Sequence, residues 1–291
     1  MNTLGAEWRT DLQMGQVGFL TSEFYQPLGT RNGLFIAPRA TLARRNLDIY
    51  QGSDRIARYD ITSYYGGLDL GAAFTRYGEM RFGVIVGRSR ATLDTGPPEF
   101  EPSPNNVPRG AFTFRALVDQ LDSANFPREG FAASLDVIAS TKALGARDEY
   151  VRWDVSAVGA YSWGRHTLSP VVRSAGAASG DTLPAYDLVQ WGGFLQQSGL
   201  PAGALLGQRL DFGRLVYFYK LQDQKLIDGL YAGASVEVGR MERPLVPGNL
   251  TGTLLSGAVF FGADTPVGPV YIGYGVATGG NRSAYLFVGR P

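Results

Sequence analysis

The feature that most constrains this chain is an alternation of apolar and polar residues with a period of two. The segment 151–163 shows it most clearly, with apolar residues at every second position and aromatic rings toward both ends. Its apolar face carries Val151, Trp153, Val155, Ala157, Gly159, Tyr161 and Trp163, and its polar face Arg152, Asp154, Ser156 and Ser162. A period of two is that of a β-strand, and an apolar face with rings at its ends is typical of a strand that crosses a bilayer. The segment therefore predicts a membrane-spanning strand.

Similar segments recur along the whole chain, separated by Gly, Asn, Asp or Pro residues. They predict about fourteen strands, at residues 5–14, 19–28, 34–49, 55–74, 80–94, 109–121, 130–143, 149–163, 166–178, 208–221, 226–240, 250–263, 269–279 and 282–290. An even number of strands suits a barrel whose two chain ends lie on the same side of the membrane. The expected fold is all-β: a transmembrane antiparallel β-barrel that occupies residues 1–291 as one domain.

The connections between the predicted strands differ in length. Short ones lie at 29–33, 76–79 and 164–165, whereas long ones lie at 96–108 and 180–207. Barrels of the bacterial outer membrane have short periplasmic turns and longer outer loops. The connections therefore predict this location and this orientation.

One predicted strand breaks the simple pattern. It keeps an apolar face from Phe82 to Val86 and then places Arg88 and Arg90 in the same phase. Two interpretations remain open. The upper part of the strand stands clear of lipid, or the phase shifts at Gly87.

A large soluble β-sandwich would also alternate, but it needs one apolar face of each sheet to pack on the other sheet. Here the polar positions in mid-strand carry charged groups: Asp60, Asp69, Asp119, Asp136, Asp154 and Glu237, with Arg39, Arg115, Arg152 and Arg173. We expect these side chains to face a water-filled lumen, either as a lining of ion pairs or as a polar conduit for a polypeptide or an ion. The membrane barrel is therefore favoured.

Composition limits the possible chemistry. Only 18% of residues are charged, the net charge is +1, and 39 residues are glycine, so a nucleic-acid partner is not expected. There is no cysteine and a single histidine, His166, which excludes a disulfide and argues against a metal site. No Gly-x-Ser-x-Gly pentapeptide occurs, and His166 lies in an expected turn. We therefore predict no enzyme activity, no metal and no cofactor.

Two local patterns resemble periplasmic turns of the bacterial surface antigen superfamily, which comprises outer-membrane insertases and two-partner translocators. The first has Phe126, Pro127 and Gly130, like the Phe-Pro-x-x-Gly turn of that family. The second comprises Thr265, Pro266, Gly268 and Pro269, like the Thr-Pro-hydrophobic-Gly-Pro turn before the penultimate strand. Proline and glycine in the first pattern also favour a tight chain reversal on physical grounds.

A third pattern comprises Trp191, Gly192, Gly193 and Phe194 within the long connection 180–207. It resembles the Val-Arg-Gly-Phe tip of the family's sixth loop, which folds back into the lumen. Gly192 stands where the family has an arginine that pairs with lumenal acidic groups. Arg173 and Arg209 are candidates to replace that arginine. The alternative is a glycine-rich surface loop with no role inside the barrel.

Within this superfamily, the early and final segments resemble the barrel of patatin-like phospholipase autotransporters. The final segment carries Tyr285 and Phe287, which we expect to form the C-terminal strand signal read by the outer-membrane barrel assembly machinery. Such barrels have sixteen strands, so the resemblance implies that the first two strands, a POTRA module and a lipase passenger precede this chain. Final strands of this class usually end in Phe or Trp, whereas the last residue here is Pro291.

The resemblance implies an outer-membrane translocator or insertase module that secretes or anchors an attached or partner protein. Expected partners are outer-membrane lipids, the assembly machinery and the transported polypeptide, with a patatin-like lipase in cis and a homodimer as further options. A seam between 6–13 and 283–288 would open laterally. The alternative function is that of a passive porin-like or structural barrel.

Overall fold

The computed structural model describes residues 4–15, 17–29, 33–51, 54–74, 77–100, 104–224, 227–246, 252–266 and 268–289. Its strands are β1 (Glu7–Gln13), β2 (Val17–Pro27), β3 (Leu34–Gln51), β4 (Asp54–Ala73), β5 (Gly78–Thr95), β6 (Asn106–Asp119), β7 (Gly130–Ser140), β8 (Tyr150–Trp163), β9 (His166–Ala177), β10 (Val189–Trp191), β11 (Leu205–Gln224), β12 (Ile227–Pro244), β13 (Thr253–Thr265), β14 (Gly268–Ala277) and β15 (Asn281–Val288). Three short 3₁₀ helices lie in connections: η1 (Pro98–Phe100), η2 (Lys142–Leu144) and η3 (Ala185–Asp187). Within the described ranges, no helix is long and apolar enough to span a membrane.

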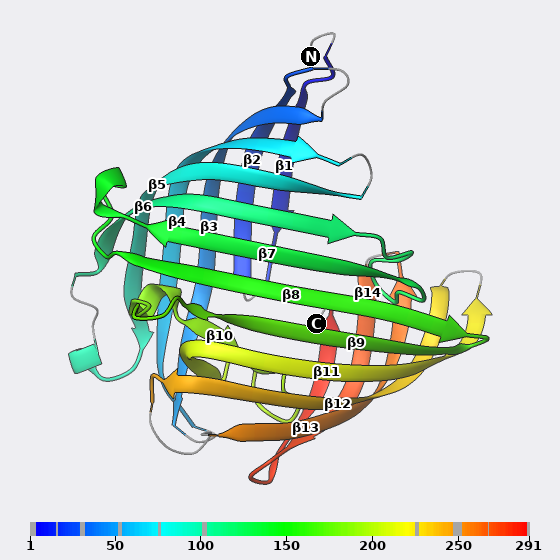
Figure 1. Ribbon diagram of the computed structural model, residues 1–291. Coiled ribbons are helices and arrows are strands. Elements are labelled where there is room, and N and C mark those ends of the chain that lie inside the picture. Colours follow the sequence, from blue (N-terminus) through cyan, green and yellow to red (C-terminus); the bar gives the residue numbers. More distant parts are fainter. Residues whose placement is uncertain are drawn as a thin grey trace.

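Apart from β10, which lies off this path, each strand pairs antiparallel with the strand that follows it, β9 with β11, so the sheet is a single meander. The sheet curls strongly, and Figure 1 shows β1 to β4 and β14 behind the strands β5 to β13. The all-β antiparallel barrel predicted from the sequence is confirmed, and every predicted strand is present. The short strand β10 pairs only with β11 and was not predicted. Residues 226, 250, 251 and 290, at the ends of predicted strands, lie outside the described residues.

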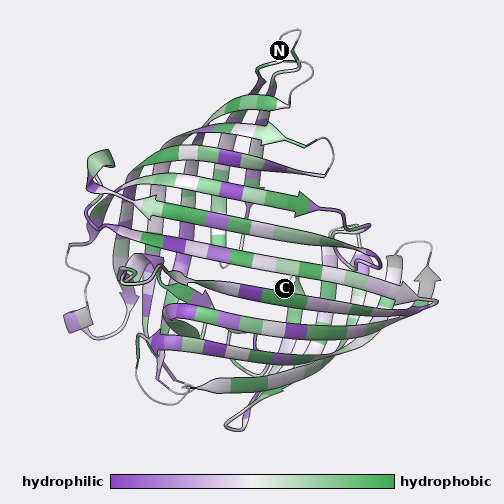
Figure 2. Cartoon of the chain, in the orientation of Figure 1, coloured by the Kyte–Doolittle hydropathy of each residue, from purple (hydrophilic) through white to green (hydrophobic). Residues whose placement is uncertain are grey.

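The two faces of the sheet have opposite character, as the alternating colours along the strands in Figure 2 show. The outward face carries large apolar side chains that remain more than half exposed, among them Trp8 (68%), Phe82 (65%), Val236 (70%) and Leu286 (75%). Such a surface requires an apolar surrounding, which a bilayer provides.

The lumenal face carries most of the expected ion pairs. Arg39 binds Asp69 at 2.9 Å, and Arg173 binds Asp154 at 2.7 Å. The prediction for Asp60 was wrong, because β4 places it in phase with the exposed Tyr64 on the outward face. Asp60 lies near the start of β4, outside the lipid core, where charge is tolerated on either face. The sequence therefore did not indicate which face Asp60 occupies.

The connections gather at two ends of the barrel. The inserted loop, residues 178–204, and the described residues of the connection after β5 (96–100, 104 and 105) lie at one end, here named the loop end. The turn 164–165, Pro266 and the connection 120–129 lie at the other end, here named the turn end. The connection 120–129 is long for its end because part of it folds into the lumen, as described below.

Candidate functional site

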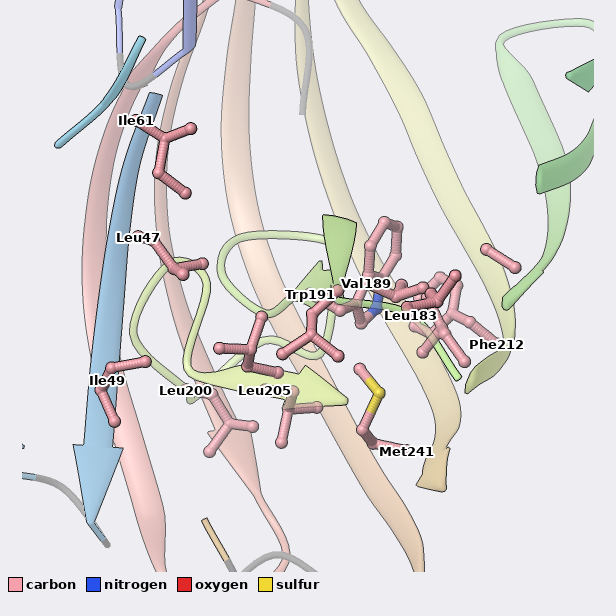
Figure 3. Packing of buried hydrophobic residues seen from close by; sticks show 14 of the residues in the cluster. Leu47, Ile49, Ile61, Leu183, Val189, Trp191, Leu200, Leu205, Phe212 and Met241 are labelled. Carbon is pink, nitrogen blue, oxygen red and sulfur yellow. The ribbon is translucent and has the colours of Figure 1, made fainter. Parts of the chain in front are cut away.

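The inserted loop folds back into the lumen, where its apolar side chains form the core of the barrel's loop-end half. Leu183, Leu188, Val189 and Leu200 are each at most 3% exposed. The same cluster contains Leu47, Ile49 and Ile61 from β3 and β4, and Phe212 and Met241 from β11 and β12 (Figure 3). Because opposite walls contribute to one cluster, the loop bridges the lumen.

The η3 helix attaches the loop to strands β6, β8 and β3. Arg109 on β6 donates to Asp187 at 2.6 Å, and the Tyr150 hydroxyl donates to the same carboxylate. Arg45 on β3 donates to the carbonyl of Tyr186. Burial, together with a hydrogen bond to Asp148, raises the pKa of Tyr186 above its usual range. Tyr186 therefore remains a hydrogen-bond donor at neutral pH.

Glu237 on β12 holds the loop tip, residues 192–200. Its carboxylate is fully buried and accepts from the backbone N–H groups of Gln197 (2.8 Å) and Ser198 (2.6 Å). It also accepts from the hydroxyls of Ser198 (2.7 Å), Ser235 (2.6 Å) and Ser256 (3.0 Å). All five donors are neutral, so the carboxylate is satisfied by hydrogen bonds.

Arg214 on β11 holds the other side of the same turn. It lies directly across the ladder from Glu237 and donates to the Leu195 carbonyl at 2.5 Å. Between these two contacts, Leu195 (φ 56°) and Gln197 (φ 79°) adopt the left-handed conformation. A residue with a side chain rarely adopts this conformation unless surrounding contacts impose it. The opposed charges on β11 and β12 supply such contacts.

The loop tip is also bound to the last strand, β15. The Tyr285 hydroxyl accepts from the Gly199 N–H (2.8 Å) and donates to the Leu200 carbonyl (2.9 Å). The Phe194 ring packs on Tyr285 and Phe287, with centroid distances of 5.3 and 6.1 Å. The edge strand β15 is therefore attached to the loop tip.

Glycines on the lumenal face make room for the loop tip. A Cβ at Gly239 would lie 2.3 Å from the Gln197 Oε1 atom, and one at Gly275 would lie 2.7 Å from the Ser198 Cβ atom. Both distances are shorter than real contacts allow. These strand glycines therefore mark a close approach of chain segments rather than only curvature.

The turn-end connection 120–129 inserts Phe126 into the lumen from the opposite side. Its ring stacks on Tyr231 at 4.1 Å and lies 5.2 Å from Tyr271. Pro127 follows it, and Gly130 has φ +100° with no space for a Cβ beside the Gln120 carbonyl. Since Phe194 of the loop tip also lies 5.4 Å from Tyr271, the two inserted segments meet at one tyrosine.

The second turn pattern closes the β13–β14 hairpin. Thr265 donates to the Gly268 carbonyl at 2.6 Å, and Gly268 has φ +110°. Pro266 is exposed in the turn, while Pro269 is buried and its carbonyl accepts from the N–H of Gly289, the residue after β15, at 2.8 Å. The pattern is thus local turn chemistry that also places the last strand.

The third pattern lies where the loop enters its tip. Trp191 is buried under the Arg173 guanidinium at 4.7 Å, and Gly192 and Gly193 both have positive φ. Arg173 pairs with the lumenal Asp154, and Arg209 pairs with Asp211, whereas Arg214 is the arginine that lies opposite Glu237.

Sequence reasoning did not identify Gln197 and Ser198, whose backbone N–H groups donate to the buried Glu237 carboxylate. The available signal was a second Gly-apolar pair, Gly199-Leu200, six positions after Gly193-Phe194.

A lipid-facing antiparallel barrel with a loop folded into its lumen defines an outer-membrane transport barrel. Residues 8–263 match the Omp85 superfamily domain, and the chain belongs to the Omp85 superfamily. Proteins of this superfamily reside in the bacterial outer membrane as non-enzymatic transporters and insertases. The predicted location and, for the barrel domain itself, the predicted lack of enzyme activity are therefore confirmed by the family.

Solved structures show the same fold. BamA from Haemophilus ducreyi lacking POTRA domains 1–3 is similar with a TM-score of 0.71 and 12% identity, covering 93% of this chain and 61% of that one. CdiB from Escherichia coli (TM-score 0.61, 12% identity, 93% and 52%) and CdiB from Acinetobacter baumannii (0.57, 10%, 94% and 47%) are also similar. The chain thus spans 47 to 61% of the length of these structures. No curated protein matches it in sequence.

Proposed function

We propose that this barrel secretes or anchors an attached or partner polypeptide, and that the inserted loop must leave its seat for the barrel to work. The observation that carries this proposal is the attachment of one loop tip to both Glu237 of β12 and Tyr285 of β15. Because β15 is an edge strand, movement of the loop tip would break the hydrogen bonds that Tyr285 makes with it and would release this edge of the sheet. A passive pore, the alternative, has no need of such an attachment.

The free edges of the sheet support lateral opening. Within the described part of the chain, β1 pairs only with β2, and β15 only with β14. An unpaired edge is a template for an added strand. On the resemblance to patatin-like phospholipase autotransporters, we propose that two further strands complete a sixteen-stranded barrel and that a POTRA module and a lipase passenger belong to the same protein. The assembly machinery and a second copy of the chain are further proposed partners.

A reversible cross-link tests whether the loop must move. The chain has no cysteine, and the hydroxyls of Ser198 and Ser235 share one acceptor oxygen on Glu237. Ser198→Cys with Ser235→Cys should therefore form a disulfide that fixes the tip to β12. In the full-length protein, we expect oxidation to stop export of the polypeptide and reduction to restore it.

The two single-cysteine variants, oxidised in the same way, are the matched controls. Undiminished export by the fully cross-linked protein would show that the loop stays in place during transport. A steady ion-selective conductance, with no effect of the barrel on export, would support the passive pore instead.

A further inference from the structure

Two arginines that break the apolar pattern of β5 lie on its outward face. The register between β4 and β5 is continuous from Leu70↔Phe82 to Thr62↔Arg90, so the phase does not shift at Gly87. Arg88 and Arg90 therefore point the same way as Phe82, and both are exposed.

Strand pairing brings a third arginine beside them. The ladder places Arg44 of β3 opposite Thr62 of β4, and Thr62 opposite Arg90. The row next to it contains Leu42, Tyr64 and Arg88. Neighbouring strands are about 4.8 Å apart. The three guanidinium groups thus surround Thr62 and Tyr64 on one patch, here named the arginine patch (Arg44, Arg88 and Arg90).

The arginine patch lies at the boundary of the lipid-facing band. From Met80 to Arg90, β5 advances roughly 33 Å along the strand, or about 25 Å along the membrane normal at the usual tilt. The apolar band of such barrels is about 25 Å tall. Apolar side chains of Leu42 and Val86, both at least half exposed, lie just inside the boundary, with the Tyr64 ring beside them.

The arginine patch has more positive than negative charge. Arg44 binds Asp60 at 2.5 Å, whereas among the described residues Arg88 and Arg90 have no ion-pair partner. Two other exposed arginines at the loop end are paired, since Arg209 binds Asp211 at 3.1 Å and Arg240 lies 3.6 Å from Glu242. Two unpaired guanidinium groups at an interface attract an anion, and guanidinium geometry suits the oxygens of a phosphate.

We propose that the arginine patch binds the phosphate of a phosphorylated lipid in the leaflet at the loop end. The phosphate lies between Arg88 and Arg90, within reach of the Thr62 hydroxyl, and the acyl chains lie on Leu42, Val86 and Phe82. The lipid is favoured over a soluble anion because the cationic and apolar surfaces adjoin on the same strands.

Binding of lipid A, a diphosphorylated glycolipid, to the purified full-length protein in nanodiscs tests the proposal. Each of Arg88→Gln and Arg90→Gln should weaken lipid A binding about fivefold, and the double variant roughly 25-fold. Arg240→Gln, an outward arginine at the same end with a carboxylate neighbour, should leave binding unchanged. Dephosphorylated lipid A should bind the wild type as weakly as lipid A binds the double variant.

Three outcomes would overturn the proposal. They are equal binding of lipid A by wild type and double variant, equal binding of the dephosphorylated lipid by the wild type, and displacement of lipid A by millimolar inorganic phosphate. Heat-modifiable mobility of the double variant, equal to that of the wild type, establishes that it is folded.

Discussion

Arg214 and Glu237 face each other across β11 and β12, and each binds a different side of the same lumenal turn. The guanidinium of Arg214 donates to the Leu195 carbonyl, while the carboxylate of Glu237 accepts from the N–H groups of Gln197 and Ser198. Two opposite charges on neighbouring strands therefore hold the loop tip. Neither contact requires a charged residue in the loop itself.

Glu237→Gln should release the loop tip. An amide offers one acceptor oxygen where the carboxylate offers two, and it removes the negative charge opposite Arg214. Loss of hydrogen bonds to a buried charge costs about 2–3 kcal/mol, so the free energy of opening the loop should fall by that amount. Chymotrypsin digestion of the folded barrel measures the effect, because Trp191 and Phe194 become accessible on opening.

Glu242→Gln is the matched control for this variant, since Glu242 makes an exposed pair with Arg240. If the loop of Glu237→Gln were cleaved no faster than that of Glu242→Gln, the carboxylate would not be what holds the tip.

Tyr285→Phe should loosen the contact between the plug and β15. The substitution keeps the ring that packs on Phe194 but removes the hydroxyl shared by Gly199 and Leu200. We expect faster hydrogen exchange at the Gly199 amide, corresponding to about 1–1.5 kcal/mol. Tyr274→Phe on the outward face of β14 should leave that amide protected.

Gly239→Ala should destabilise the seated loop through steric conflict. The new Cβ would lie 2.3 Å from the Gln197 Oε1 atom, and overpacking of this kind costs about 1–3 kcal/mol. Gly213→Ala is the matched control, because a Cβ there meets only Val238 at 3.5 Å. The loss of heat-modifiable mobility with temperature measures both variants. Equal curves would mean that the loop accommodates the added methyl group.

The strands of the barrel wall were predictable because nearly all of them obey a local rule, a period of two with one face in lipid, whereas the lumenal β10 was not predicted. Val151 to Trp163 needed no information from elsewhere in the chain. The position of the inserted loop in the lumen was not predictable. The Glu237 carboxylate accepts from neutral backbone N–H groups of Gln197 and Ser198, which lie about forty residues away in the sequence. The insertion of Phe126 between β11 and β14 depends equally on the closed tertiary arrangement.

Phe126→Ala should open the turn-end half of the lumen. The ring stacks on Tyr231 and lies 5.9 Å from Phe218, and it borders a cavity of about 290 Å³ beneath Leu195. Truncation enlarges that cavity and costs about 3–5 kcal/mol if the site does not collapse. Because the same ring contacts Tyr271, which also supports Phe194, the loop tip should become more accessible as well. Planar-bilayer conductance should rise and chymotrypsin should cut the loop faster, whereas Phe131→Ala, on the outward face, should change neither. A rise in conductance without faster cleavage would mean that the two inserted segments move independently.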